Sequence, residues 1–107
     1  MPKTHDGETP VVFRSYSDDE IIALFPTLPG GRYGECMSYL HIGQHGAADY
    51  GHVIRRTRPA TADEAFQLWE ELIKVGYDDL KVYHREQPWM HDALRDAHEA
   101  SRIAPVQ

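Results

Sequence analysis

The fold is decided by the stretch VVFRSYSDDEIIALF, residues 11–25. Two runs rich in β-branched and aromatic side chains, residues 11–16 and 21–25, flank the turn-forming residues 17–20. Two such runs joined by a short polar turn predict an antiparallel hairpin. The second run is continuously apolar, which is typical of a central strand covered on both faces. The sequence therefore predicts a sheet built around residues 21–25.

The residues that follow predict two more strands and a long connection between them. Prolines and glycines break the pattern over residues 26–34, and strands are expected over residues 35–42 and 51–57. The connection, HIGQHGAADYGH at residues 41–52, interleaves three histidines and one aspartate with three glycines. A helix would bring the histidines and the aspartate onto one face, but each glycine costs about 1 kcal/mol in a helix relative to alanine. The connection is therefore expected to be a loop.

Two helices are predicted in the C-terminal half. Thr61-Ala-Asp-Glu64 is a capping box, in which Thr61 caps the helix and Glu64 bonds back to it, and Gly76 supplies the C-terminal cap. A half-buried strand is expected over residues 80–84, and Pro88 suits the start of a second helix. The buried stripe of the first helix is expected to comprise Ala65, Leu68, Trp69, Leu72 and Ile73.

Together these elements predict an α+β fold. Its antiparallel-dominated sheet of about five strands, in the order β-β-β-β-α-β-α, is packed by one long helix and followed by a C-terminal helix. We expect a flexible tail over residues 1–9, a single domain over residues 10–86 and the C-terminal helix over residues 87–107. That helix could also be a dimerisation element with an exposed patch formed by Trp89, Met90 and Leu94.

The amino-acid composition limits the kinds of protein to which this chain can belong. The chain has 107 residues, of which 41% are hydrophobic and 26% charged, as in ordinary single globular domains. No apolar run approaches the ~20 residues of a membrane span, and the N-terminus lacks the apolar core of a signal peptide. The net charge of −6 disfavours direct nucleic-acid binding. The single cysteine, Cys36, fits a reducing compartment, so we expect a cytoplasmic protein.

Five short segments carry a resemblance. They are IALFP (22–26), CMSY (36–39), HIGQHGAADY (41–50), TRPAT (57–61) and VGY (75–77). With them, residues 11–85 resemble short uncharacterised proteins encoded on bacterial mobile elements and in phage-like gene neighbourhoods. The resemblance brings no established activity, cofactor or catalytic residue. It implies a setting, because small mobile-element proteins often act on host machinery, including defence systems.

The candidate binding site is the segment 41–52 with the basic run that follows it. Imidazoles supply donors and acceptors, and glycines allow close approach of the backbone. The guanidinium groups of Arg55-Arg-Thr-Arg58 suit an acidic protein patch or a phosphorylated small molecule, although the run could also be an outer strand that blunts edge pairing. The candidate ligand- or partner-binding residues are His41, His45, Asp49, Tyr50, His52, Arg55 and Arg58.

Two kinds of chemistry compete with simple binding. A divalent metal such as zinc could use His41, His45, Asp49 and His52, although these residues match no recognised metal-binding signature. Cys36 with a histidine and Asp49 could form a nucleophilic site, but a cysteine within a strand pattern is expected to be a small buried hydrophobe.

Binding is the preferred hypothesis. It describes a non-enzymatic phage or mobile-element protein, without a cofactor, that binds a host protein or protein complex as an anti-defence (anti-CRISPR-like) inhibitor. A small-molecule or nucleotide-binding sponge and a small His/Asp metal-dependent enzyme are the alternatives.

Overall fold

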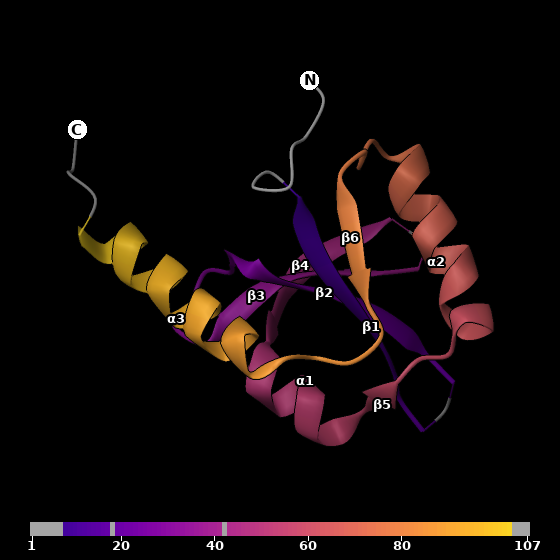
Figure 1. The fold of residues 1–107 in the computed structure, drawn as a ribbon, viewed down its shortest axis with the longest axis horizontal. Helices are drawn as coiled ribbons and strands as arrows, with labels where there is room; N and C mark the ends of the chain where they lie inside the picture. Colours follow the sequence, from indigo (N-terminus) through magenta and orange to yellow (C-terminus); the bar gives the residue numbers. More distant parts are fainter. Residues whose placement is uncertain (1–7, 18, 42, 104–107) are drawn as a thin grey trace.

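The chain folds into one sheet with helices on both faces (Figure 1). The computed structural model describes residues 8–17, 19–41 and 43–103. The elements in chain order are β1 (Thr9–Ser15), β2 (Ile21–Pro29), β3 (Glu35–Leu40), β4 (Gln44–Asp49), α1 (Tyr50–Arg56), β5 (Arg58–Pro59), α2 (Ala62–Lys74), β6 (Leu80–Tyr83) and α3 (Pro88–Ile103). In this part of the chain the six strands have the order β4-β3-β2-β1, and both β5 and β6 pair with the far side of β1.

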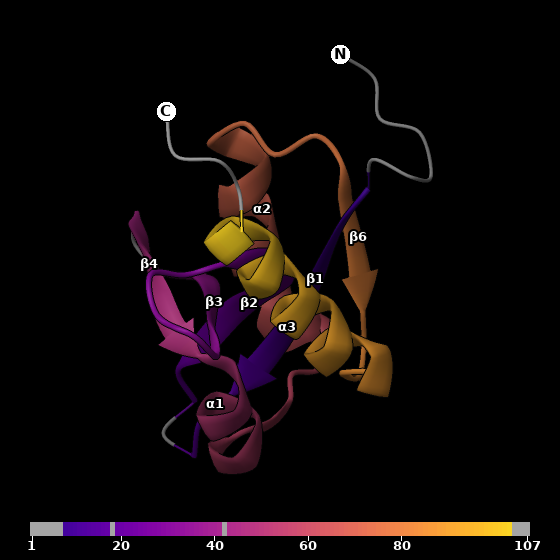
Figure 2. The same ribbon diagram turned by 90° about the vertical axis from the view of Figure 1, so that its left-hand side faces the viewer.

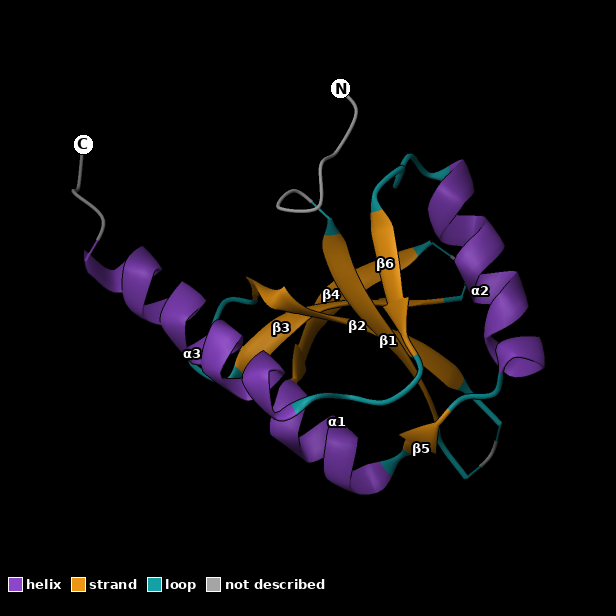
Figure 3. Cartoon of the chain, in the orientation of Figure 1, coloured by secondary structure: helices purple, strands orange, loops and turns teal. Residues whose placement is uncertain are grey.

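The N-terminal hairpin forms as predicted. β1 and β2 pair antiparallel, with Val12 opposite Leu24 and Ser15 opposite Ile21. β2 lies between β1 and β3, and its residues 22–25 are buried, so the prediction of a central strand is confirmed. The α+β class with an antiparallel-dominated sheet is confirmed as well (Figure 3). A short helix, α1, and the two-residue strand β5 are additional to the predicted order.

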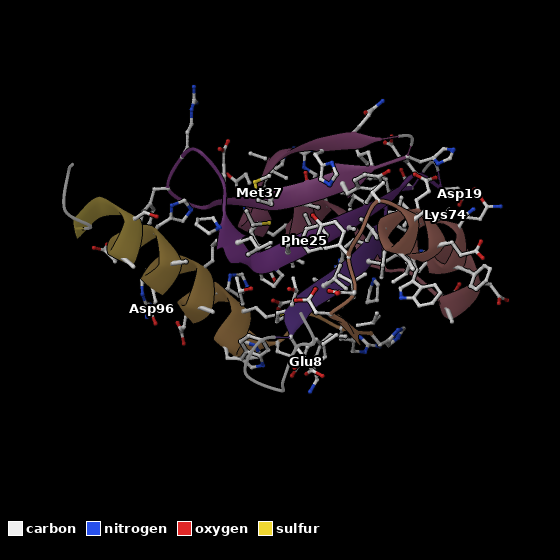
Figure 4. The ribbon with its side chains drawn as sticks, turned by 90° about the horizontal axis from the view of Figure 1, so that it is seen from above. Glu8, Asp19, Phe25, Met37, Lys74 and Asp96 are labelled. Atoms are coloured by element: carbon white, nitrogen blue, oxygen red, sulfur yellow. The ribbon has the colours of Figure 1, made fainter. Side chains whose placement is uncertain are left out.

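Alternating side chains of the strands build two cores, one on each face of the sheet. Seen from above, Phe25 lies between α2, which carries Lys74, and α3, which carries Asp96 (Figure 4). The core under α2 includes Val11, Phe13, Phe25, Tyr39, Leu68 and Leu72. The core under α1 and α3 includes Val12, Leu24, Cys36, Tyr50, Val53, Met90 and Leu94.

The segment 41–52 is not a loop, which corrects our expectation. Residues 44–49 form β4 and pair with β3 along their whole length. The turn before them needs Gly43, whose φ of 64° lies in the left-handed region that glycine adopts without strain. Glycine and alanine at positions 46–48 leave little side chain to bury, so the hydrophobic alternation that would reveal a strand is missing.

The prediction of a strand over residues 51–57 is also wrong, because α1 covers most of this segment. Asp49 supplies the N-cap, and its carboxylate accepts a hydrogen bond from the backbone N–H of His52 at 3.0 Å. Tyr50 and Val53 are the residues of α1 that are buried in the core. One glycine, Gly51, is tolerated in the first turn of this short helix.

α2 confirms the predicted capping box. The N–H of Glu64 donates to Thr61 Oγ1 at 3.1 Å, the N–H of Thr61 donates to the Glu64 carboxylate at 2.9 Å, and Gly76 follows the helix with a φ of 119°. The predicted burial of Trp69 and Ile73 is wrong, because they are 37% and 41% exposed. The buried residues of α2, which pack on the sheet, are Ala65, Leu68 and Leu72.

The last two elements form where they were predicted. β6 pairs parallel with β1, so Thr9 belongs to the sheet, whereas residues 1–7 of the expected tail lie outside the described residues. α3 begins at Pro88 and buries Met90 and Leu94, so only Trp89 of the expected exposed patch lies at the surface. None of the described helices is long and apolar enough to cross a membrane.

Candidate functional site

β4 divides the predicted binding residues into two groups. His41 and His45 lie at the turn between β3 and β4, whereas Asp49 and Tyr50 lie at the opposite end of β4 and His52 lies on α1. A strand rises about 3.4 Å per residue, so His45 and Asp49 are separated by roughly 14 Å along β4. Among the described residues, no three histidine, cysteine or acidic side chains are grouped to hold a metal ion.

A polar contact ties the β3–β4 turn to α2. The carboxylate of Glu71 accepts a hydrogen bond from the Tyr39 hydroxyl at 3.0 Å and contacts Nδ1 of His41, and the N–H of Gly43 donates to the Tyr39 oxygen at 3.0 Å. Burial opposes ionisation of Glu71, but its hydrogen bonds with Tyr39 and His41 outweigh burial and lower the pKa of this carboxyl. Burial and the bond to Glu71 raise the pKa of Tyr39.

Aromatic contacts fix the ring of His45 in the same region. It packs edge-on against Tyr39, with centroids 4.7 Å apart, and its Nε2 lies 3.4 Å from the hydroxyl of Tyr77. Tyr77 in turn stacks on Phe25 at 5.2 Å. No pattern in the sequence singled out Tyr39 or Tyr77, although the pairing of Tyr39 with His45 follows once the β3–β4 hairpin is known.

A cavity of about 280 Å³ opens beside His41. Carboxylates make this cavity a poor site for a phosphate, and one of them, Glu64, is bound by both Nη atoms of Arg58 at 2.9 and 2.7 Å. The hydrogen bonds from Arg58 lower the pKa of Glu64 to about 2. Arg58 is therefore engaged within its own chain, which argues against a phosphate-binding role. The lining residues are Asp19, Glu20, Ile21, His41, Glu64, Gln67 and Leu68.

Tyr50 is part of the core under α3. Its hydroxyl donates to Glu86 at 3.0 Å, and Nε2 of His91 lies 3.1 Å from the same carboxylate oxygen. Burial raises the pKa of Tyr50, and its side chain is 1% exposed. Tyr50 therefore joins α1 to the start of α3, and its hydroxyl is not available to a partner.

The basic run lies at the end of α1 and in β5, not along one outer strand. Arg55 and Arg56 are exposed in the last helical turn. A buried arginine that the sequence did not single out, Arg14, donates to the carbonyls of Ile54 at 3.1 Å and Thr57 at 2.8 Å. A cation at this position complements the negative end of the helix, so Arg14 has a structural role.

Cys36 is a buried hydrophobe, as predicted. Burial raises the pKa of its thiol to about 12. Because the thiolate is the reactive form, the structure gives no support to a cysteine nucleophile.

An apolar groove between α2 and β6 is a surface feature that the sequence did not predict. Phe66 and Val82 on its two sides are 52% and 50% exposed, and Phe66 stacks on Trp69 with centroids 6.2 Å apart. We call it the α2–β6 groove, lined by Phe13, Ala62, Ala65, Phe66, Trp69 and Val82. The signal in the sequence was the width of the apolar stripe on α2, which exceeds what one contact with a sheet requires.

The groove continues along β6. A second hollow of about 200 Å³ adjoins the first, which has a similar volume, and shares Phe13, Ala62, Ala65 and Val82 with it. The remaining lining of the second hollow is formed by Ala60, Thr61, Tyr83 and His84. Two adjoining apolar hollows beside an edge strand are a surface suited to binding, because large apolar side chains gathered at a surface mark interaction sites.

Comparison of the chain with protein-family models, with curated proteins and with solved structures found no match. The function is therefore argued from the surface of this molecule.

Proposed function

We propose that the protein is a non-enzymatic protein-binding module whose binding surface is the α2–β6 groove. The observation that supports this most strongly is the exposure of Phe66, Trp69 and Val82 around one hollow. Water contact with large apolar side chains is unfavourable, and aromatic residues are enriched at the centres of protein interfaces. Burial by a partner would remove this cost.

The occupant we propose is an extended segment of the partner, lying along β6. Thr9 donates its N–H to the carbonyl of Asp79 at 2.8 Å, and hydrogen bonds of a parallel ladder recur at every second residue. The N–H and C=O groups of Leu80 and Val82 consequently point away from β1. A strand added to β6 can bond to them.

The two hollows fit the same occupant. Alternate side chains of an extended chain lie on one face about 6.7 Å apart, so residues i and i+2 of the segment can enter adjoining hollows. Each hollow, at about 200 Å³, suits one large apolar side chain. A partner with two apolar residues at this spacing satisfies the side-chain and the backbone requirements together.

The resemblance to mobile-element proteins suggests the biological setting. We propose that the partner is a host protein and that occupation of the groove inhibits it, in the manner of an anti-defence protein.

Two tryptophans of similar exposure provide the test. Trp69 borders the groove, whereas Trp89 lies on α3, and they are 37% and 41% exposed. Affinity purification from host lysate with wild-type protein, Trp69→Ala and Trp89→Ala should recover a stoichiometric partner with the wild type and Trp89→Ala only. A peptide scan of that partner should then identify an extended apolar segment that competes for binding. A partner retained by Trp69→Ala, or the absence of any stoichiometric partner, would contradict the proposal.

A further inference from the structure

β4 is the second open edge of the sheet, and its backbone polarity can be assigned. In Figure 2 it forms one margin of the molecule, and no strand of the described residues pairs with its outer side. The N–H of Tyr50 donates to the carbonyl of Gly34 at 3.0 Å, which continues the antiparallel register of Glu35 with Asp49. Hydrogen-bonded pairs alternate along such a ladder, so the even-numbered residues of β4 bond to β3. The odd-numbered residues His45, Ala47 and Asp49 therefore direct their N–H and C=O groups outward.

This edge lacks the devices that protect open strands. Edge strands are usually blunted by proline, lysine, a bulge or an inward-pointing charge. β4 reads QHGAAD, contains no proline or lysine, and pairs with β3 in an uninterrupted register. The side chains of glycine and alanine at positions 46–48 are small enough for another backbone to approach β4 closely.

The sequence of β4 is complementary to itself. A regular antiparallel pair of two copies must place odd-numbered residues opposite odd-numbered residues. With the two-fold axis at Ala47, Ala47 meets its own copy and His45 meets Asp49 of the second copy, on both sides of the axis. An imidazole then lies opposite a carboxylate in each pair, which is a favourable cross-strand combination.

The neighbouring register is less favourable. With the axis at Gly46, His45 would lie opposite Ala47 of the second copy and Asp49 opposite Gly43. The N–H of Gly43 is already bound to the Tyr39 hydroxyl. The axis at Ala47 is therefore the arrangement that uses every outward backbone group of β4 and pairs the imidazole of each copy with a carboxylate of the other.

We propose that the protein forms a two-fold dimer through antiparallel pairing of β4 with β4 of a second copy. The joined sheet runs through both copies. The α2–β6 groove lies at the opposite edge of each sheet and stays open, so the dimer is independent of the proposed function.

Hydrogen exchange at increasing protein concentration tests the polarity of the edge. Sedimentation equilibrium should show a reversible monomer–dimer equilibrium. The amides of His45, Ala47 and Asp49 should gain protection as the dimer fraction rises, whereas those of Gly46 and Ala48, already bonded to β3, should not change. A chain that stays monomeric at all concentrations, or gains protection elsewhere, would overturn the proposal.

Two substitutions test the register. Ala47→Lys should abolish the dimer, and Ala100→Lys, the same change at an exposed position of α3, should not. His45→Asp should weaken the dimer by placing two carboxylates opposite each other, and adding Asp49→Asn, which keeps the helix cap, should restore part of the association. Circular dichroism checks that each variant is folded. A dimer that survives both Ala47→Lys and His45→Asp would place the interface on another surface.

Discussion

Glu64 connects Arg58 of β5, the cap residue Thr61 and the first turn of α2. Its carboxylate accepts hydrogen bonds from the guanidinium of Arg58 and from the N–H of Thr61, while its own N–H bonds to the Thr61 side chain. The bonds from Arg58 contribute most to the low pKa of about 2, and the bond from Thr61 adds to it. One residue thus caps the helix and joins β5 to α2.

The pH dependence of stability follows from this pKa. A carboxyl whose pKa is lower in the folded state stabilises the protein above its unfolded-state pKa of 4.5, and loses this contribution as the pH falls toward about 2. We expect Glu64→Gln to be less stable than the wild type at neutral pH, and the difference to shrink between pH 4.5 and about 2. Urea unfolding at several pH values measures it. Glu70→Gln removes an exposed carboxylate of the same helix as a control, and an equal pH dependence in both variants would contradict the assignment.

Asp49 is one of the predicted binding residues that have a structural role. Asp49 is the N-cap of α1, so Asp49→Ala should lower the free energy of unfolding by about 1 kcal/mol. Asp49→Asn should lower it little, because asparagine also caps helices. His45→Ala, at an exposed position of β4, serves as the comparison. Denaturant midpoints of the three variants measure these differences. Equal stability of Asp49→Ala and Asp49→Asn would mean that the cap is not formed.

At the scale of elements, the apolar stripe of α2 divides into a buried row and an exposed row. Leu72 is 0% exposed, so Leu72→Ala should lower the free energy of unfolding by about 2–5 kcal/mol. Trp69 lies at the surface, so Trp69→Ala should cost clearly less, about 1 kcal/mol, as expected for a partly exposed position. Thermal or chemical denaturation of the two variants decides the matter. A larger cost for Trp69→Ala would mean that the indole belongs to the core and not to the binding groove.

Sequence reasoning identified the elements that carry a strong local signal. The hairpin of β1 and β2, the capping box at Thr61 and the proline at the start of α3 each combine a hydrophobic pattern with a residue of defined backbone preference. β4 and α1 have no such pattern. Three glycines suggested a loop, but each has a different role: Gly43 makes the turn, Gly46 lies in an edge strand and Gly51 is in the first turn of α1.

The contacts that the candidate site residues make could not be predicted from the sequence, because they join distant segments. His41 meets Glu71 across 30 positions of sequence, and Tyr50 meets Glu86 across 36. Hydrophobic periodicity contains no information about such pairs. Hydrophobic periodicity likewise contains no information about the α2–β6 groove, because Phe66 and Trp69 of α2 line it together with Val82 of β6.

At the scale of the whole molecule, the sheet needs a helical cover on each face. α2 covers one face, and α1 with α3 covers the other (Figure 2). The periodicity of the C-terminal segment predicted a helix, but it could not decide whether that helix packs on the sheet or on a partner. The burial of Met90 and Leu94 against Ile22 and Leu24 assigns it to the core of this domain.

Removal of the C-terminal helix tests this assignment. Deletion of residues 87–107 would expose Val12, Ile22 and Leu24, the apolar residues of β1 and β2 that α3 covers. Burial of such side chains is the main stabilising term of a small domain, so we expect the truncated chain to lose its cooperative unfolding transition and to bind a hydrophobic dye.

Point variants in the full-length chain keep this prediction testable if the truncated protein cannot be purified. Met90→Ala and Leu94→Ala should each cost about 2–5 kcal/mol, because both side chains are almost fully buried. Trp89→Ala, one position away and 41% exposed, should cost much less. A truncated chain that unfolds cooperatively with unchanged stability, and loses only its self-association, would make α3 an interaction element and leave the face of the sheet beneath it to be covered by a second copy.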